Sequence, residues 1–333
     1  MKLINTGIEI LDQEYNEGHY MNDMFKHIEK CGRVCYKSDN LITEKSAMPF
    51  VSRMIENKHY AMLEHGTIYL VVPSCDNGVP NPLVSDYKLN TNNPSNWSII
   101  YDKIKEKYEK NPYSKVIECN VKAVENNVNK YVRNLYITTN FRVIIENKWI
   151  DDLLFMTYCH YQHDRRITVK FSIDRFTGEE FLRHRHFSFA RESTRFCNYS
   201  KSKFDNGVTF TYVPWCSTDD AVEPEHNIEE WGTILPYNTN YWNAIDWWLW
   251  SLSASETAYL NLVKQGWTAQ QARVVLPCGI SSPLVMTGFL SDWKHFFDLR
   301  YFGKTGKPHP QAYELAKALY EEFLERGYIS NDD

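Results

Sequence analysis

The sequence has no apolar run approaching the roughly 20 residues that a membrane-spanning helix needs. Its first residues lack the apolar core of a secretory signal. Eight cysteines are scattered along 333 residues, and no two stand in CxxC spacing. Cys31 and Cys35 lie one helical turn apart, but no second Cys/His pair at metal-finger spacing follows them. We therefore expect a reduced, cytoplasmic protein without a metal or a membrane attachment.

The chain also lacks an excess of positive charge, because its formal net charge is −5. Against this background, residues 183–195 concentrate four arginines and two histidines. A guanidinium group suits phosphate and carboxylate, so this segment predicts a pocket for an anionic ligand. A solvated basic helix face is the alternative. Phe187, Phe189 and Phe196 favour the pocket, since a purely solvated face would not need them.

The chain shows no internal repeat and no interdomain linker, and its mixture of helices and strands predicts an α+β fold. Strands are expected at 66–73 and 167–173, and a short helix from Thr177 should lead to Arg183. A long loop is expected at 76–97, followed by an exposed, lysine-rich helix to about residue 131. The other expected helices cover residues 21–37, 47–57, 257–264, from 268 to before Pro277, 291–300 and 310–326.

The predicted helix 291–300 carries an arginine on its apolar side. Trp293, Phe296, Phe297 and Arg300 fall on one helical face. An unpaired charge in such a place is very costly, so Arg300 needs an anion. Sequence alone allows either a carboxylate of the protein or a ligand.

Three other candidates carry weaker signals. Arg273 lies at the edge of an apolar run. The Glu64–His65 pair could act in acid–base chemistry, although such pairs are more often structural. Cys278 follows a proline, but nothing in the sequence places a base beside it, so we expect an inert cysteine in the core.

The segment Arg183-His184-Arg185, seven further residues and Ser193 resembles the signature of flavin-dependent thymidylate synthases. The segments 59–65, 271–277 and 287–300 agree with the same family in order. The resemblance spans about residues 20–325. It implies a single domain over 1–333, with mixed helices around a small, mainly antiparallel sheet and an extended insertion at about 75–165.

The family converts dUMP to dTMP with FAD, taking carbon from 5,10-methylenetetrahydrofolate and electrons from NADPH. Its members are homotetramers with active sites at subunit interfaces. By motif position, the resemblance assigns FAD to His59, Arg183, His184, Arg185, His295 and Leu299. It assigns dUMP to Glu180, Arg183, Ser193, Arg195, Arg273 and Arg300. Arg300 would carry the catalytic effect by stabilising an ionised uracil ring, and Ser193 would contact the substrate without attacking it.

The chain departs from the family pattern at several positions. Ala61 replaces a hydroxyl residue that binds the FAD phosphate, and Ala190 and Phe289 replace asparagines of some members. Glu180 replaces a glutamine of others. Arg191 is the candidate for the phosphate contact that Ala61 cannot make.

Two further hypotheses remain open. A related enzyme could modify carbon 5 of another uridine nucleotide with the same flavin site. A nucleic-acid-binding module could instead use the arginines on backbone phosphates and the phenylalanines on bases. The negative net charge disfavours this second hypothesis, and we expect no nucleic-acid partner.

Overall fold

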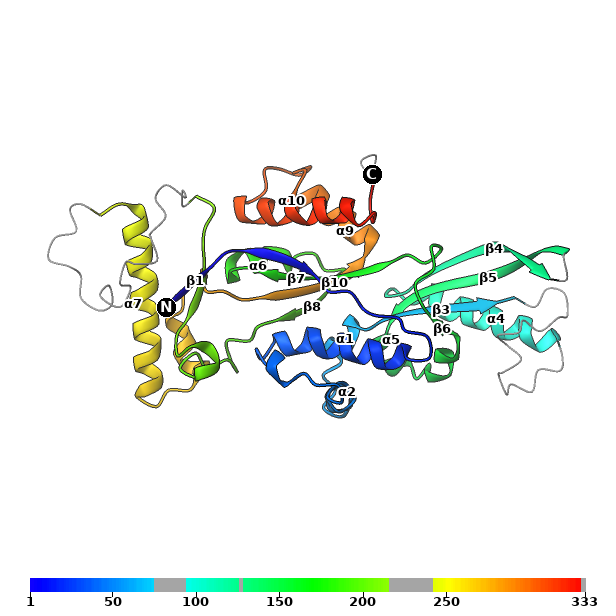
Figure 1. The fold of residues 1–333 in the computed structure, drawn as a ribbon, viewed down its shortest axis with the longest axis horizontal. Coiled ribbons are helices and arrows are strands. Elements are labelled where there is room, and N and C mark those ends of the chain that lie inside the picture. The colour runs from blue at the N-terminus through cyan, green and yellow to red at the C-terminus, as the bar shows by residue number, and fades with distance from the viewer. Residues whose placement is uncertain (75–93, 126–127, 216–241, 331–333) are drawn as a thin grey trace.

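The computed structural model describes residues 1–74, 94–125, 128–215 and 242–330, and Figure 1 shows an elongated molecule. Helix α7 (Ala244–Lys264) lies at one end. A hairpin of β4 (Lys115–Glu125) and β5 (Val128–Asn140) lies at the other. The mixture of helices and mainly antiparallel sheets confirms the predicted α+β class.

The central sheet joins segments that are far apart in the sequence. Its strands are β2 (Gly7–Ile10), β7 (Arg166–Ser172), β10 (Leu284–Phe289) and β8 (Ser188–Arg191), in that order. All neighbouring strands in this sheet run antiparallel. The sheet therefore places the segment after residue 183 beside the segment that leads to Arg300.

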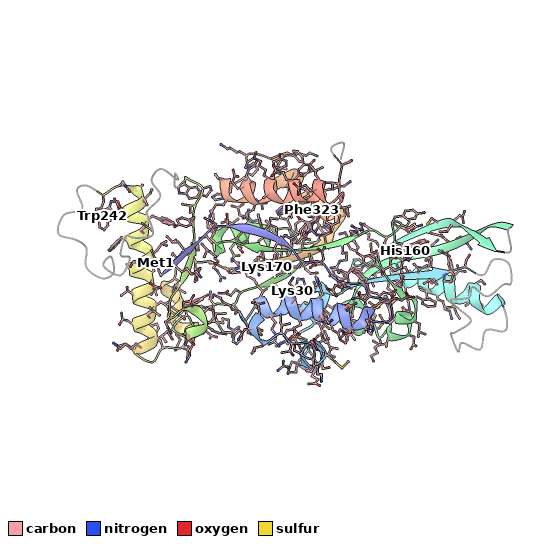
Figure 2. All side chains as sticks on the ribbon, in the orientation of Figure 1. Met1, Lys30, His160, Lys170, Trp242 and Phe323 are labelled. Carbon is pink, nitrogen blue, oxygen red and sulfur yellow. The ribbon has the colours of Figure 1, made fainter. Side chains whose placement is uncertain are left out.

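Helices cover both faces of the central sheet (Figure 1). Met286 of β10 packs in the core formed with α9 (Leu290–Arg300) and α10 (Pro310–Glu325). The next residue back, Val285, packs on the other face against α1 (Tyr20–Val34). This alternation follows from the two-residue period of a strand. Figure 2 shows side chains filling the layer between α10 and the sheet.

A second sheet has the order β4-β5-β3-β6 and includes β3 (Thr67–Pro73) and β6 (Met156–Thr157). The strand predicted at 66–73 is thus confirmed. The helices that pack around this sheet are α2 (Ala47–Glu56), α4 (Pro94–Glu109), α5 (Phe141–Asn147) and part of α1.

The predicted exposed helix up to residue 131 is wrong beyond residue 109. Only α4 is helical, and it buries Tyr101, Ile104 and Tyr108. The following residues pair as the antiparallel strands β4 and β5. The physical reason is the supply of β-branched residues such as Val116 and Ile117, which favour strands over helices. Most of the loop predicted at 76–97 lies outside the described residues, and its last four residues begin α4.

A third core forms where β1 (Lys2–Ile4) pairs in parallel with β9 (Thr209–Thr211). Helices α7 and α8 (Ala269–Ala272) supply much of its remaining surface. Among the described helices, none combines the length and the apolar character that crossing a membrane would require.

Several helices begin earlier than the sequence predicts. The α6 helix (Arg175–Phe181) is capped by Asp174, whose carboxylate accepts the Thr177 N–H at 2.8 Å, so Thr177 lies inside the helix. Helix α7 starts at Ala244 instead of Thr257, because Asn243 caps it there. Helix α9 starts one residue before Ser291. The short 3₁₀ helices cover Asp39–Leu41, Tyr60–His65, Ile150–Phe155, Ser202–Phe204 and Arg273–Val275.

Candidate functional site

The predicted signature residues Arg183, His184 and Arg185 form the turn that follows α6. The His184 N–H donates to the Phe181 carbonyl at 3.0 Å, which tightens this turn. The His184 ring is buried, and its centroid lies 5.0 Å from that of Phe296 on α9. Arg183 and Arg185 are exposed. The turn therefore anchors its histidine in the core and presents two guanidinium groups outwards.

Arg300, at the end of α9, points back to this turn. Its Nη1 donates to the Glu180 carboxylate at 2.7 Å and its Nη2 to the Glu180 carbonyl at 2.7 Å. Its Nε donates to His184 Nε2 at 3.1 Å. The aromatic stripe preceding Arg300 is fully buried, as predicted. Of the two anions that the sequence allows for Arg300, the structure shows the protein carboxylate, Glu180.

These contacts determine the protonation of His184. Burial lowers its pKa to about 4, with further lowering from the positive charge of Arg300 and from His295. Because His184 Nε2 accepts a hydrogen bond from Arg300 Nε–H, the neutral imidazole ring carries its hydrogen on Nδ1. Burial also lowers the pKa of Arg300, and the charge of Arg183 acts in the same direction against the effect of Glu180. The site is thus a concentration of positive charge that one carboxylate offsets.

His295 lies beside His184, with ring centroids 6.2 Å apart, and is exposed. Within the described part of the chain, no carboxylate forms an ion pair with Arg183 or Arg185. Both guanidinium groups are therefore available to an external anion. We call the following set the α6–α9 cluster: Glu180, Arg183, His184, Arg185, His295, Leu299 and Arg300.

The remaining predicted substrate residues gather elsewhere. The Arg195 Nε donates to the Gln270 side chain at 3.0 Å, and the Arg273 Nη1 donates to Thr194 Oγ1 at 3.1 Å. Sequence reasoning missed Gln270 and Thr194, and no spacing signal points to them. We call the second set the α8 cluster: Ser193, Arg195 and Arg273.

The α6–α9 cluster and the α8 cluster are not joined by any hydrogen bond or ion pair among the described residues. His59 precedes the 3₁₀ helix Tyr60–His65, and its side chain is exposed. Within the range that the structure describes, no hydrogen bond connects His59 to either cluster. The two clusters and His59 thus share no direct hydrogen bond among the described residues.

Arg191 is held within the protein. Its Nε donates to Ser282 at 2.9 Å, its Nη1 to Glu179 at 2.9 Å and its Nη2 to the Arg175 carbonyl at 2.7 Å. A methyl group at Gly178 would come within 2.7 Å of Nη2, so the guanidinium packs tightly against α6. A phosphate contact would require Arg191 to exchange these partners.

The weaker sequence candidates Glu64 and His65 contact other side chains of the protein. Glu64 pairs with Arg142, and His65 Nδ1 lies 2.8 Å from Thr287 Oγ1. Burial lowers the pKa of His65 to about 3. Cys278 is exposed, so its predicted place in the core is wrong, because the turn after Pro277 lies at the surface. The described residues contain no group of three or more His, Cys, Asp and Glu side chains that could hold a metal.

Solved structures give three comparisons. The UMP/dUMP methylase PolB from Streptomyces cacaoi bound with 5-Br dUMP is 13% identical, with a TM-score of 0.40, over 98% of this chain and 93% of that chain. Its complex with 5-Br UMP is also 13% identical, with a TM-score of 0.40, over 98% and 92%. Thymidylate Synthase X from Helicobacter pylori, solved with FAD and dUMP, is 16% identical, with a TM-score of 0.33, over 50% and 72%.

No curated protein is similar enough to the chain to be recognised as a relative. A family model described as "Thymidylate synthase complementing protein" does match, over residues 125–326. This range contains both clusters and excludes only His59 among the predicted site residues. It also covers more than half of the chain. The chain therefore belongs to the family of thymidylate synthase complementing proteins.

Proposed function

We propose that the protein is an FAD-dependent thymidylate synthase that reductively methylates dUMP to dTMP. The carbon donor would be 5,10-methylenetetrahydrofolate and the reductant NADPH. The observation that carries the proposal is the attachment of Arg300 to Glu180 and His184, because it joins the signature turn to the end of α9. Membership of the family supports the same reaction.

Arg300 is the residue to which we assign the main catalytic effect. Carbon 5 of uracil is a poor nucleophile, and negative charge in the ring improves it. A guanidinium fixed by three hydrogen bonds in a partly buried place can stabilise that charge without reorganising during the reaction. Glu180 and His184 would thus orient the catalytic arginine, and the α8 cluster, in which Arg195 is exposed, would contact the nucleotide.

The residues present fit an anionic cofactor such as FAD. Arg183 and Arg185 are exposed and have no carboxylate partner within the described residues, so they suit a pyrophosphate. When bound, FAD would supply the hydride chemistry. The chain would hold it through the signature turn, with His295 and Leu299 on the neighbouring helix. The buried, neutral His184 would anchor the signature turn to the core.

We further propose that complete active sites form between protomers of a homotetramer. The support is that no hydrogen bond or ion pair among the described residues joins the α6–α9 cluster to the α8 cluster, although both hold residues assigned to dUMP. A single nucleotide could contact both clusters if each came from a different protomer. This arrangement would also bring in His59.

The test is a product assay with purified protein, methylenetetrahydrofolate, FAD and NADPH. dUMP and UMP are offered in parallel, and product masses are recorded. We expect dUMP to gain the mass of one CH2 unit, because a methyl group replaces the hydrogen on carbon 5, with kcat/KM well above that for UMP. Preferred methylation of UMP, or a product of different mass, would replace the proposal with the alternative of another C5-modifying uridine enzyme.

Flavin content separates the enzyme from a nucleic-acid-binding module. We expect yellow protein that releases FAD on denaturation. A colourless preparation that takes up no flavin and shifts a DNA or RNA probe would contradict the enzyme proposal.

A further inference from the structure

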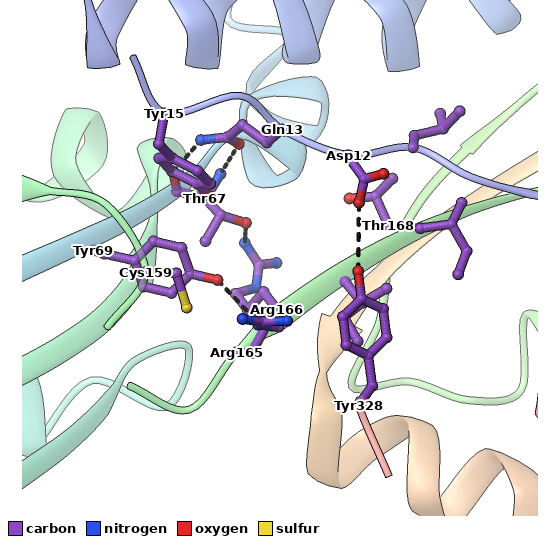
Figure 3. Close-up of a pocket in the computed structure, with 13 residues that line it drawn as sticks. Asp12, Gln13, Tyr15, Thr67, Tyr69, Cys159, Arg165, Arg166, Thr168 and Tyr328 are labelled. Carbon is purple, nitrogen blue, oxygen red and sulfur yellow. Dashed lines mark hydrogen bonds between the residues drawn. The ribbon is translucent and has the colours of Figure 1, made fainter. Parts of the chain in front are cut away.

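A cavity of about 200 Å³ is lined by residues that belong to neither the α6–α9 nor the α8 cluster (Figure 3). It forms where the start of β7 meets the segment after β2, the first residues of β3 and the chain after α10. None of its lining residues is assigned to dUMP or FAD. Because Arg165 and Arg166 supply its positive charge, we call it the Arg165–Arg166 cavity.

Arg166 is partly buried at the wall of this cavity. Its Nη1 donates to the Glu64 carbonyl at 3.0 Å and to Thr67 Oγ1 at 3.3 Å, and its Nη2 reaches Ser188 Oγ at 3.4 Å. All three acceptors are uncharged. Burial lowers the pKa of Arg166, which reflects the cost of keeping this charge away from water. A buried guanidinium of this kind gains from a neighbouring anion.

Arg165 brings a second positive charge to the same space. Its guanidinium lies 5.0 Å from the Tyr328 ring centroid, and its side chain also hydrogen-bonds the Cys159 thiol, so both of these partners are uncharged or weakly acidic groups. Within the described chain, neither arginine forms an ion pair with a carboxylate. The cavity's acidic residue, Asp12, is paired with Arg326 at 2.8 Å. Two guanidinium groups therefore share one cavity with no carboxylate in ion-pair contact among the described residues, although Glu64 and Asp292 attract Arg166 from farther away.

The walls are rigid and amphipathic. Tyr15 and Tyr69 pack with ring centroids 5.3 Å apart, and the Tyr69 hydroxyl accepts the Arg166 backbone N–H at 3.1 Å. The Gln13 side chain is bonded twice to the backbone of Thr67 (Figure 3). These contacts hold the polar groups in place before any ligand arrives, which lowers the entropic cost of binding.

We propose that the Arg165–Arg166 cavity binds a small oxyanion, the phosphate or carboxylate group of a small molecule. Planar guanidinium groups recognise both kinds of anion. The volume is below the roughly 300–1,000 Å³ of drug-sized pockets and suits a phosphate or a short dicarboxylate. This proposal is independent of the proposed reaction, because it rests on other residues.

Cys159 provides a local probe, since it lines the cavity and is partly exposed. Its rate of alkylation by iodoacetamide is measured by mass spectrometry in inorganic phosphate, in succinate and in sodium chloride of equal ionic strength. Cys119 on β4, with similar exposure, is the internal reference. We expect phosphate or succinate to slow alkylation of Cys159 at least fivefold relative to chloride and to leave Cys119 unchanged. The anion that slows alkylation of Cys159 shows whether the cavity prefers a phosphate or a carboxylate group.

The variant Arg165→Gln removes one charge at an exposed side chain, so folding should be preserved. We expect it to abolish the protection of Cys159, whereas Arg53→Gln, an exposed arginine on α2, should keep it. Equal protection in Arg165→Gln, or none in the wild type, would overturn the proposal. If Cys159 does not react at all, titration calorimetry decides. An anion site that Arg165→Gln weakens at least tenfold supports the proposal, and identical isotherms overturn it.

Discussion

Arg300 and His184 share a hydrogen bond of 3.1 Å in which the guanidinium Nε–H donates to the imidazole Nε2. This bond exists only while the imidazole is neutral, since a protonated ring offers no lone pair. The lowered pKa of His184 keeps it neutral over the physiological range. The positioning of the proposed catalytic group thus depends on the histidine of the signature turn.

The substitution Arg300→Ala should reduce kcat about 10²–10³-fold, the usual effect of losing a preorganised charge that stabilises a transition state. FAD content and oligomeric state should stay unchanged, because Arg183 and Arg185 remain. Steady-state kinetics with dUMP, absorbance spectra and light scattering provide the measurements. Arg326→Ala, which removes an exposed and ion-paired arginine, is the matched control. Near-normal turnover in Arg300→Ala would refute the assigned role.

Ser193→Ala should keep measurable activity. The variant removes a contact to the nucleotide worth about 0.5–1.5 kcal/mol, so KM for dUMP should rise about tenfold or less. Loss of a true nucleophile would instead lower kcat by four or more orders of magnitude. Saturation kinetics distinguish the two cases. Complete inactivity with unchanged dUMP binding would mean that Ser193 takes part in the chemistry.

Stability should fall as the pH drops from about 6.5 towards 4. Burial lowers the pKa of His27, His163 and His184 to about 4 and that of His65 to about 3. The unfolded chain therefore binds more protons than the folded one in this window, and acid favours unfolding. Urea denaturation at several pH values measures the slope.

The histidine variants His65→Gln and His19→Gln make a matched pair for this test. His65 is fully buried and His19 is exposed. We expect the buried substitution to make stability less dependent on pH, by on the order of 2 kcal/mol across the window, and the exposed one to leave the slope unchanged. A flat stability profile in the wild-type protein would contradict the assignment.

Gly288→Ala should destabilise the protein by about 1–3 kcal/mol through overpacking. Its new methyl group would meet the Phe187 ring at 2.6 Å, and Phe187 packs edge-on against Trp293 with centroids 4.6 Å apart. Gly7→Ala is the control, since nothing lies within 4 Å of its added methyl group. Chemical denaturation compares the two. Equal stabilities would show that the Phe187 ring moves aside freely.

A mixing experiment tests the proposed shared active site. Arg300→Ala alters the α6–α9 cluster and Arg195→Ala the α8 cluster, so each variant alone should be nearly inactive. Mixed oligomers should regain activity, because some sites would receive one intact cluster from each protomer. Native mass spectrometry checks that mixing occurs. If mixed oligomers form and stay inactive, each active site lies within a single protomer.

The sequence predicts local patterns well where one residue type dominates. The aromatic stripe ending at Arg300 is buried as predicted, and the strand predicted at 167–173 appears as β7, although Thr168 on its other face is buried as well. The lysine-rich residues 103–110 favour a helix, and the prediction that this helix continues to about residue 131 fails because β4 begins at Lys115. The β-branched residues from Val116 onwards carried the opposing signal.

Long-range pairing is what sequence reasoning could not supply. Glu180 and Arg300 are 120 positions apart, and only the central sheet brings them together. The three bonds of Arg191 likewise depend on α6 and on Ser282, which no local pattern connects. Nothing in the sequence singles out Arg165 and Arg166, because adjacent arginines before a strand are common and only the fold shows that they line a cavity.

The strand β10 continues into α9 without an intervening loop. Residues 284–300 therefore form one continuous segment that begins within the central sheet and ends at Arg300. A small shift in the position of β10 would therefore shift α9 and the guanidinium group of Arg300. Substitutions in this segment should consequently affect both the stability of the fold and the turnover of the enzyme, even at positions that do not contact a ligand.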